Sequence, residues 1–310
     1  MATSKPSPFD LYKAKSASQA SKILEDIKNG NKSFKKDERF WRQTVDAAGN
    51  GKAVLRFLPP VASEDLPYIK LWTHSFKGPH GYYIENSLTT LDQNDPLSEW
   101  NNKLWNTEVK QYRDMVSRQK RRLQYIANVL VVKDYGNPKN DGKVMLYQFG
   151  KKIHEKMVAL MQPKFEGEVP INPFDLESGC NFTLRIKKQQ DFPNYDDSTF
   201  DSPSELCGGN VDKINAVLTQ LHPLQPFIES TNFKSYDDLK KRLLKAVGED
   251  APFIDFLVDG AAGTSRPTTP KPSQAVSNRS SAPVESVDEP VAEVESTDDI
   301  DSYLESLGAD

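Results

Sequence analysis

The stretch that decides the fold is QYRDMVSRQKRRLQYIANVLVVK, residues 111–133. Its second half is an apolar, β-branched run of strand length. Its middle gathers four cations within five positions: Arg118, Lys120, Arg121 and Arg122. The stretch therefore predicts basic groups held at one end of a buried strand.

Two tyrosines, Tyr112 and Tyr125, flank this basic cluster. Cations interleaved with aromatic rings suit single-stranded nucleic acid, because phosphates bind the cations and unpaired bases stack on the rings. The alternative is a solvated, charged helix end that runs into a core strand. This stretch by itself favours neither interpretation.

Composition and charge distribution bound the possibilities. The 310 residues allow one large domain or two small ones with tails, and 37% hydrophobic with 27% charged residues indicates that part of the chain is disordered. The net charge of −4 hides a segregation: residues 280–310 hold ten acidic and no basic residues, which leaves 40 basic against 34 acidic residues before them, or +6. A basic body with an acidic tail is typical of nucleic-acid-binding proteins.

Two cysteines, Cys180 and Cys207, are too few for a disulfide scaffold and favour a reducing compartment. The N-terminus has no apolar signal region, and no 18 apolar residues run together. We therefore expect a soluble protein of the cytoplasm, the host cytoplasm if it is viral, with no membrane partner.

The N-terminal segment, residues 1–30, is basic. Over residues 11–28 the side chains of Ile23, Leu24 and Ile27 share one helical face among lysines, and Asn29 and Gly30 end the pattern. So narrow an apolar stripe does not hold a short helix folded alone. The segment is expected to dock on its own body or on a neighbouring protomer.

The body of the chain reads as strands joined by turns. The alternation of apolar residues and the turn signals predict strands over 53–58, 68–76, 82–84, 125–132, 144–149 and 182–187, and helices over 154–161 and 235–248. Residues 85–106 read as a polar insert. The prediction is a mostly β, antiparallel body with helices, an α+β fold.

The C-terminal part changes character after residue 260, where Pro, Ser, Thr and Ala predict a linker. Near the end, four apolar residues stand among acids at helical spacing: Ile300, Tyr303, Leu304 and Leu307. They fit a helix that forms on a partner protein, and unbound acidic coil fits equally well.

Catalytic motifs find no support. Gly150-Lys151-Lys152 lacks the upstream glycine and the hydroxyl residue of a phosphate-binding loop, and neither a G-x-S-x-G nor an H-E-x-x-H motif occurs. Asp196, Asp197 and Asp201 stand beside prolines and read as turn residues. The sequence therefore predicts a protein that is not an enzyme.

Four separated blocks carry a family resemblance. They are WRQTVDAAGNGKAVLRFLP at 41–59, ANVLVVKD at 127–134, FGKKI at 149–153 and FPNYD at 192–196. In order and spacing they resemble the single-stranded DNA-binding, helix-destabilising protein of T-even-type tailed phages. The likeness covers residues 10–202 and returns in general character at the acidic tail.

The resemblance implies three parts. Residues 1–30 would serve cooperative self-association, 31–258 would form an OB-fold core with a DNA cleft, and 259–310 would be a flexible linker and an acidic tail that recruits replication and recombination proteins. By position, the resemblance assigns cleft roles to Arg56, Trp105, Tyr112, Tyr125, Tyr147, Phe192 and Tyr195. Lys13, Lys15 and Ser16 resemble the assembly motif, in which Ala14 and Ala17 are departures.

The resemblance also implies a structural zinc site of one histidine and three cysteines. His74 matches the histidine, but residues 85–100 contain no cysteine. Losing three thiolates removes most of a binding free energy that is about 10–16 kcal/mol for structural zinc. We therefore expect no metal and no cofactor, with apolar packing in place of zinc by Leu88, Leu91, Leu97 and Trp100. The alternative is a substitute site made by His74, His80, Asp92 and Asp95.

The function these observations favour is sequence-tolerant, cooperative binding of single-stranded DNA, which protects the strand and destabilises duplex during viral replication, recombination and repair. The alternatives are an RNA-binding regulator and a metal-dependent nuclease. Equal or stronger affinity for unstructured RNA would favour the first, and Mg²⁺-dependent cleavage the second.

Overall fold

Strand β5 (Arg122–Asp134) is the strand around which the others are arranged. It pairs antiparallel with β6 (Val144–Gly150) along one edge. Along its other edge it pairs first with β3 (Tyr68–Gly78) and then with β2 (Gly51–Phe57). The computed structural model describes residues 37–189 and 192–258, so the N-terminal segment 1–30 and the tail 259–310 lie outside the described residues.

The other strands extend this arrangement. Most pairings are antiparallel, as expected, and the short β1 runs parallel to β6. The remaining strands are β1 (Phe40–Trp41), β4 (Gly81–Asn86), β7 (Cys180–Gln189), β8 (Phe192–Asn194) and β9 (Thr199–Pro203). β4 forms a hairpin with β3, and β7 pairs with β2, β8 and β9. The mixed sheet with helices confirms the α+β class.

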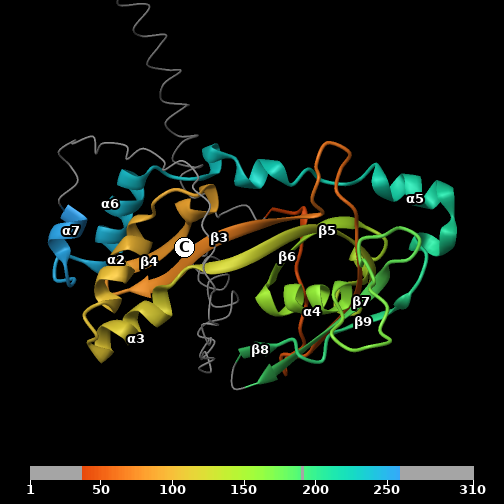
Figure 1. The fold of residues 1–310 in the computed structure, drawn as a ribbon, viewed down its shortest axis with the longest axis horizontal. Coiled ribbons are helices and arrows are strands. Elements are labelled where there is room, and N and C mark those ends of the chain that lie inside the picture. The colour runs from red at the N-terminus through yellow and green to blue at the C-terminus, as the bar shows by residue number, and fades with distance from the viewer. Residues whose placement is uncertain (1–36, 190–191, 259–310) are drawn as a thin grey trace, which may run out of the picture. The chain divides into compact units, whose positions relative to one another are not determined.

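Helices flank the strands at separate places. Figure 1 shows α2, α3, α6 and α7 around one end of β3 and β5, and α4 beside β6 farther along. The α-helices are α2 (Pro96–Trp105), α3 (Lys110–Gln119), α4 (Lys151–Met161), α5 (Val211–Leu218), α6 (Tyr236–Val247) and α7 (Ile254–Val258). The 3₁₀ turns are η1 (Leu88–Leu91), η2 (Pro138–Asn140), η3 (Leu206–Gly209), η4 (Gln225–Ile228) and η5 (Ser230–Asn232). No helix in the described ranges is long and apolar enough to cross a membrane.

The first core lies under the sheet formed by β2, β5, β6 and β7. Its centre is Phe57, whose ring contacts Tyr147, Phe149, Phe174 and Phe182 at centroid distances of 5.5–6.4 Å. Ile153 and Met157 of α4 are buried in the same cluster. Alternate strand residues point to one face, so these rings form a single packed layer.

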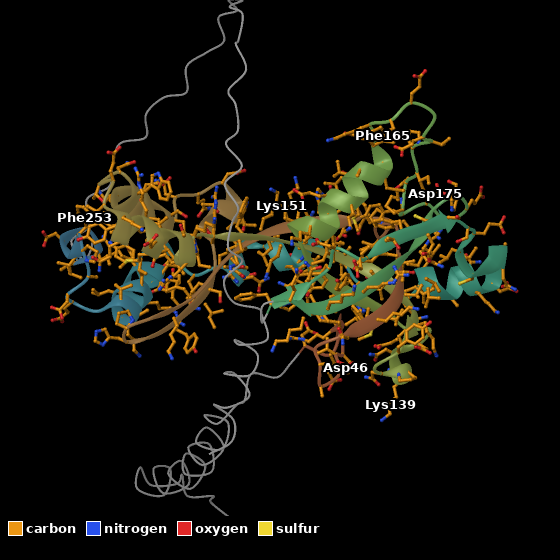
Figure 2. The ribbon with its side chains drawn as sticks, turned by 90° about the horizontal axis from the view of Figure 1, so that it is seen from below. Asp46, Lys139, Lys151, Phe165, Asp175 and Phe253 are labelled. Carbon is orange, nitrogen blue, oxygen red and sulfur yellow. The ribbon has the colours of Figure 1, made fainter. Side chains whose placement is uncertain are left out.

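The second core joins segments that are distant in sequence. Phe76 and Tyr83 from the β3–β4 hairpin pack with Trp100 of α2 and with Leu239 and Leu243 of α6. The helix predicted after Ser235 is confirmed, because the Ser235 side chain caps it by accepting from Asp238 N–H. Residues from α6 to α7, for which the sequence suggested no role, thus complete this core. Figure 2 shows Phe253, in the turn before α7, at this end.

One glycine permits the close approach of α6 to the hairpin. A Cβ added at Gly78 would lie 2.3 Å from the carbonyl oxygen of Ala246, which real atoms do not tolerate. The same oxygen accepts a hydrogen bond from His80 N–H at 3.0 Å. Any larger residue at position 78 would therefore push α6 off the hairpin.

The stretch 85–106, predicted as a polar insert, instead contributes to this core. It forms η1 and α2, and Leu88, Leu97 and Trp100 are buried while Leu91 is half-buried. Asp95 caps α2 by accepting from Ser98 N–H, and Pro96 occupies the first helical position. The apolar packing expected of Leu88, Leu97 and Trp100 is thus present. Helix α2 was not predicted, although Asp95 and Pro96 are a helix start signal.

A buried polar network lies beside this packing. His74 and Asp95 are both about 1% exposed, and Nε2 of His74 lies 3.1 Å from Oδ1 of Asp95. The other Asp95 oxygen accepts from Ser87 Oγ and from Leu88 N–H. Nδ1 of His74 lies 3.3 Å from the Gln119 carbonyl oxygen, which links β3 to α3. Burial by itself raises the pKa of Asp95, but His74, Ser98 and Ser87 together hold it at about 2.

The first prediction concerns Asp95. Its folded pKa of about 2 lies below the unfolded value of about 3.9, so its stabilisation is complete above about pH 4 and is lost as pH falls toward 2. Asp95→Asn should lower the free energy of unfolding at pH 7 by about 2–3 kcal/mol, because the charge that pairs with His74 is removed.

Denaturant unfolding at pH 7 and at lower pH measures this effect. Asp92→Asn is the matched control, because Asp92 is exposed and caps η1 with a backbone conformation that asparagine also adopts. Equal unfolding free energies for the two variants would contradict the role given to Asp95.

The second prediction concerns metal. The two His74 ring nitrogens already face Asp95 and Gln119, and no group of three or more His, Cys, Asp or Glu residues suited to a metal occurs within the described ranges. A zinc chelator should therefore leave the melting temperature unchanged. Elemental analysis that finds one zinc per chain, or a chelator-induced fall in melting temperature, would contradict this.

Candidate functional site

The basic cluster lies where α3 changes into β5. Lys120 ends the helix with an extended backbone, φ −58° and ψ 149°, after its N–H has bonded to Val116. Arg118, Lys120 and Arg121 are exposed, and none forms an ion pair with another described residue. The predicted delivery of cations to the start of a buried strand is therefore confirmed, and three of them are available to an anion.

An indole lies beside these cations. The Arg121 guanidinium lies 4.3 Å from the centroid of the Trp72 ring, and Trp72 stands opposite Leu123 in the β3–β5 pairing. Trp72 is half-buried, with the Arg121 guanidinium over its ring. We call Arg118, Lys120, Arg121 and Trp72 the strand-entry cluster. It joins positive charge to an aromatic face within one patch.

A second cation–ring pair lies on the neighbouring helices. Arg113 of α3 lies 5.1 Å from the ring of Trp105, which is 47% exposed at the end of α2. Tyr112 is half-buried and packs against the second core. Trp105 and Tyr112, both assigned to a cleft by resemblance, thus retain exposed surface on α2 and on α3, the helix that also carries Arg118.

Tyr125 is placed differently from the expectation. It is 4% exposed, and the His154 ring lies parallel to it at 4.0 Å and 8°. The Tyr68 hydroxyl lies 3.3 Å from His154 Nε2, and both of these rings are half-buried. Burial and the nearby Lys70 lower the pKa of His154, while Glu155 opposes them. A ligand reaching this stack would meet Tyr68 and His154 before Tyr125.

Tyr147 and Arg56 are interior residues, and the cleft roles that the resemblance assigns to them stay predictions. Tyr147 is 2% exposed and packs edge-on against Trp41 at 5.2 Å. Arg56 is 1% exposed, and its guanidinium donates to the carbonyl oxygens of Asp175 and Ser204. Burial lowers the pKa of Arg56. These side chains hold loops and the sheet in place instead of facing solvent.

A second patch lies along α4 and the β7–β8 hairpin. Phe192 and Tyr195 are half-buried there, and Tyr195 accepts a hydrogen bond from Gln43 at 3.1 Å. Lys156 donates to the Asp196 carbonyl oxygen at 2.9 Å, so α4 lies beside the segment that carries both rings. We call Lys152, Lys156, Lys187, Phe192 and Tyr195 the hairpin cluster. Lys151 marks the first turn of α4 in Figure 2.

Three carboxylates near this patch, those of Asp196, Asp197 and Asp201, each have a partner within the protein. Asp196 pairs with Lys152 at 3.7 Å, and Asp197 pairs with Lys187. Asp201 accepts from Thr183 Oγ1 at 3.0 Å. The carboxylates are thus neutralised or hydrogen-bonded one by one. Asp196 and Asp197 lie in a turn, as predicted, whereas Asp201 lies in β9, which corrects the prediction for that residue. The strand-entry cluster offers cations beside a ring, which suits binding of a polyanion with flat groups. The lysines of the hairpin cluster already contact Asp196 and Asp197.

Sequence reasoning missed three rings of this surface: Trp72, Tyr68 and His154. Tyr68, Lys70 and Trp72 alternate along β3 and share a face with Tyr125, because cross-strand partners point the same way. This alternation of residues along the strand is the signal in the sequence that places Tyr68 and Trp72 on one face of β3. Sequence alone does not separate a tryptophan on the exposed face of a strand from one in the core.

Comparison with known proteins identifies the family. Residues 49–247 match a family described as "gp32 DNA binding protein like". The chain is 34% identical over 261 residues to the single-stranded DNA-binding protein of Enterobacteria phage T4, which covers 82% of this chain and 83% of that protein. It is 33% identical to the single-stranded DNA-binding protein of Enterobacteria phage T2, again over 82% of this chain and 83% of that protein. This family is not enzymatic, and by both matches the chain belongs to the gp32-like family of phage DNA-binding proteins.

Proposed function

We propose that this protein binds single-stranded DNA with little regard to sequence. The observation that carries the proposal is the strand-entry cluster, where three cations without ion-pair partners in the described chain adjoin the ring of the half-buried Trp72. Phosphates would bind the cations, and bases would stack on the rings. The names of the T4 and T2 relatives support the same ligand.

The energetics favour single strands. Stacking contributes about 1–3 kcal/mol per base and tolerates sequence, because every base has a flat face. Each phosphate contact adds a salt-sensitive contribution through release of counterions. A protein that holds single strands this way destabilises duplex by mass action, since it binds the open form preferentially.

The proposed DNA surface consists of those cations and rings of the site whose side chains are exposed or half-buried. They are Tyr68, Trp72, Trp105, Tyr112, Arg118, Lys120, Arg121, Arg122, His154, Phe192 and Tyr195. Tyr125, Tyr147 and Arg56 act behind this surface. Tyr125 supports the ring of His154, and Arg56 fixes the loops at residues 175 and 204.

The family supports a wider role that stays part of the proposal. The described core would be of the OB-fold type, residues 1–30 would mediate cooperative assembly through Lys13, Lys15 and Ser16, and the acidic tail would recruit replication and recombination proteins through Ile300, Tyr303, Leu304 and Leu307. The protein would then coat DNA during viral replication, recombination and repair in the host cytoplasm.

A fluorescence titration with poly(dT) at several salt concentrations tests the function, with poly(U) and duplex DNA as competitors. We expect tight binding to poly(dT) that weakens linearly on a logarithmic salt scale. Equal or tighter binding to poly(U) would favour the RNA-binding alternative. Cleavage of either polymer after addition of Mg²⁺ would favour the nuclease alternative.

The third prediction concerns Trp72. Trp72→Leu keeps an apolar side chain but removes the indole, so affinity for a short oligo(dT) should fall about 5- to 150-fold, the equivalent of about 1–3 kcal/mol. Tyr135→Leu is the matched control, because Tyr135 is 54% exposed, its ring contacts Lys52 at 4.8 Å, and neither residue belongs to either cluster. Equal affinities of the two correctly folded variants for the oligonucleotide would contradict the proposed role of Trp72 in DNA binding.

The fourth prediction concerns assembly. Deleting residues 1–28 should abolish cooperative clustering on long single-stranded DNA, because the segment that contacts the neighbouring protomer is gone. Binding to a short oligonucleotide should change little, since both clusters remain. Sedimentation or electron microscopy of long complexes measures clustering, and cooperativity that survives the deletion would refute the assembly role.

A further inference from the structure

An exposed apolar patch lies at the end of α4 and in the loop that follows it. Of the thirteen large hydrophobic side chains that are exposed in the described chain, four fall within residues 158–169: Val158, Met161, Phe165 and Val169. The two in α4 are three positions apart and share a helix face. Phe165 and Val169 are each 76% exposed, the highest value among the thirteen. We call these four residues the loop patch. Exposed apolar side chains gathered in one place mark a contact with another protein.

Backbone hydrogen bonds fix the shape of this loop. The Glu168 N–H donates to the Phe165 carbonyl oxygen at 3.3 Å, which closes a turn. Gly167, the third residue of the turn, has φ 91°, a conformation that glycine adopts without strain. The Ile171 N–H donates to the Leu160 carbonyl oxygen at 3.1 Å and ties the returning chain to α4. Figure 2 shows Phe165 in the loop beyond the end of α4. The loop therefore presents Phe165 outward on a closed turn.

Two exposed acids stand within the loop patch. Glu166 and Glu168 separate Phe165 from Val169 in the sequence, and neither acid forms an ion pair with another described residue. Residues 162–171 hold these two acids and a single lysine. Negative charge repels phosphates, so nucleic acid is a poor occupant of the patch. The occupant that fits is a segment in which apolar side chains stand among positive charges.

The N-terminal segment has this composition. Residues 1–36, which lie outside the described residues, carry eight lysines and three acids, a net charge of +5, and include Ile23, Leu24 and Ile27. The other candidates carry the wrong charge. Residues 280–310 hold ten acids and no basic residue, and the same patch on a second copy brings its own two glutamates. Complementary charge favours the right partner at an interface, and like charges disfavour the wrong ones.

We infer that the loop patch receives the N-terminal segment of a neighbouring protomer on DNA. The apolar residues of that segment pack on Phe165 and Val169, and its lysines lie beside Glu166 and Glu168. The inference rests on the proposed assembly of the protein on DNA, and it names the surface that this assembly uses. A segment docked on its own protomer would not join two copies, so assembly requires docking between neighbours.

The first test changes the loop patch in the full-length protein. It measures the ratio of the affinity for long poly(dT) to the affinity for an oligo(dT) that holds one protomer. In the double variant Phe165→Ser with Val169→Ser this ratio should fall about tenfold or more, because apolar burial between protomers is lost. Val211→Ser is the matched control, since Val211 is 67% exposed and lies in α5, outside the loop patch. Equal ratios for the double variant and the control would overturn the inference.

The same ratio shows whether the two segments contact each other. Adding the double variant to the deletion of residues 1–28 should lower the ratio no further than the deletion alone, because both changes remove one contact. A further fall of the ratio would overturn the inference. A deletion that leaves the ratio unchanged would refute the proposed assembly role itself, and absence of binding to poly(dT) would refute the proposed function.

A second measurement needs no variant. Unlabelled and isotope-labelled full-length protein are mixed on long poly(dT), lysines are joined to adjacent carboxylates by a zero-length crosslinker, and linked peptides are identified by mass spectrometry. Lysines of residues 1–36 should be linked to Glu166 or Glu168 in pairs that combine one labelled and one unlabelled peptide. Links to these glutamates that occur only within one isotope, or an absence of links to them, would overturn the inference.

Discussion

The antiparallel pairing of β5 with three neighbours is the interaction on which the rest of the structure depends. The first half of β5 pairs with β3 and its second half pairs with β2, while β6 pairs along the opposite edge of β5. Alternate residues of one strand therefore contribute to separate apolar clusters. The same pairing fixes the position of Arg121 over Trp72, because Trp72 is held opposite Leu123. The ladder thus places the ring, and Arg121 stands in the short connection directly before the first residue of β5.

Burial separates two kinds of aromatic residue that look alike in the sequence. Tyr125 and Tyr147 are rings of the first core, while Tyr68 and His154 cover Tyr125 from the solvent side. A buried tyrosine still matters for stacking, because it fixes the plane of the ring above it. The parallel arrangement of His154 on Tyr125 shows how a core residue can orient a more exposed one.

Much of the fold follows from the sequence, and its departures have physical causes. The run after Arg122 and the helix after Ser235 carry strong periodic signals, and both form as predicted. Helix α2 was missed because its exposed face is rich in polar residues such as Asn102, although Asp95 and Pro96 announce its start. The burial of Arg56 could not be foreseen. Its guanidinium binds the carbonyl oxygens of Asp175 and Ser204, which follow Arg56 in the chain by 119 and 148 positions.

The composition of the second core also bears on how the chain is made. Phe76 and Trp100 come early in the sequence, while Leu239, Leu243 and Leu257 come more than 130 residues later. A ribosome that adds about 5–20 residues per second needs several seconds or more to deliver that interval. The nascent chain must carry the early apolar residues without their native cover until α6 and α7 emerge. A truncated product that ends before Tyr236 would keep those surfaces open and would be prone to aggregate.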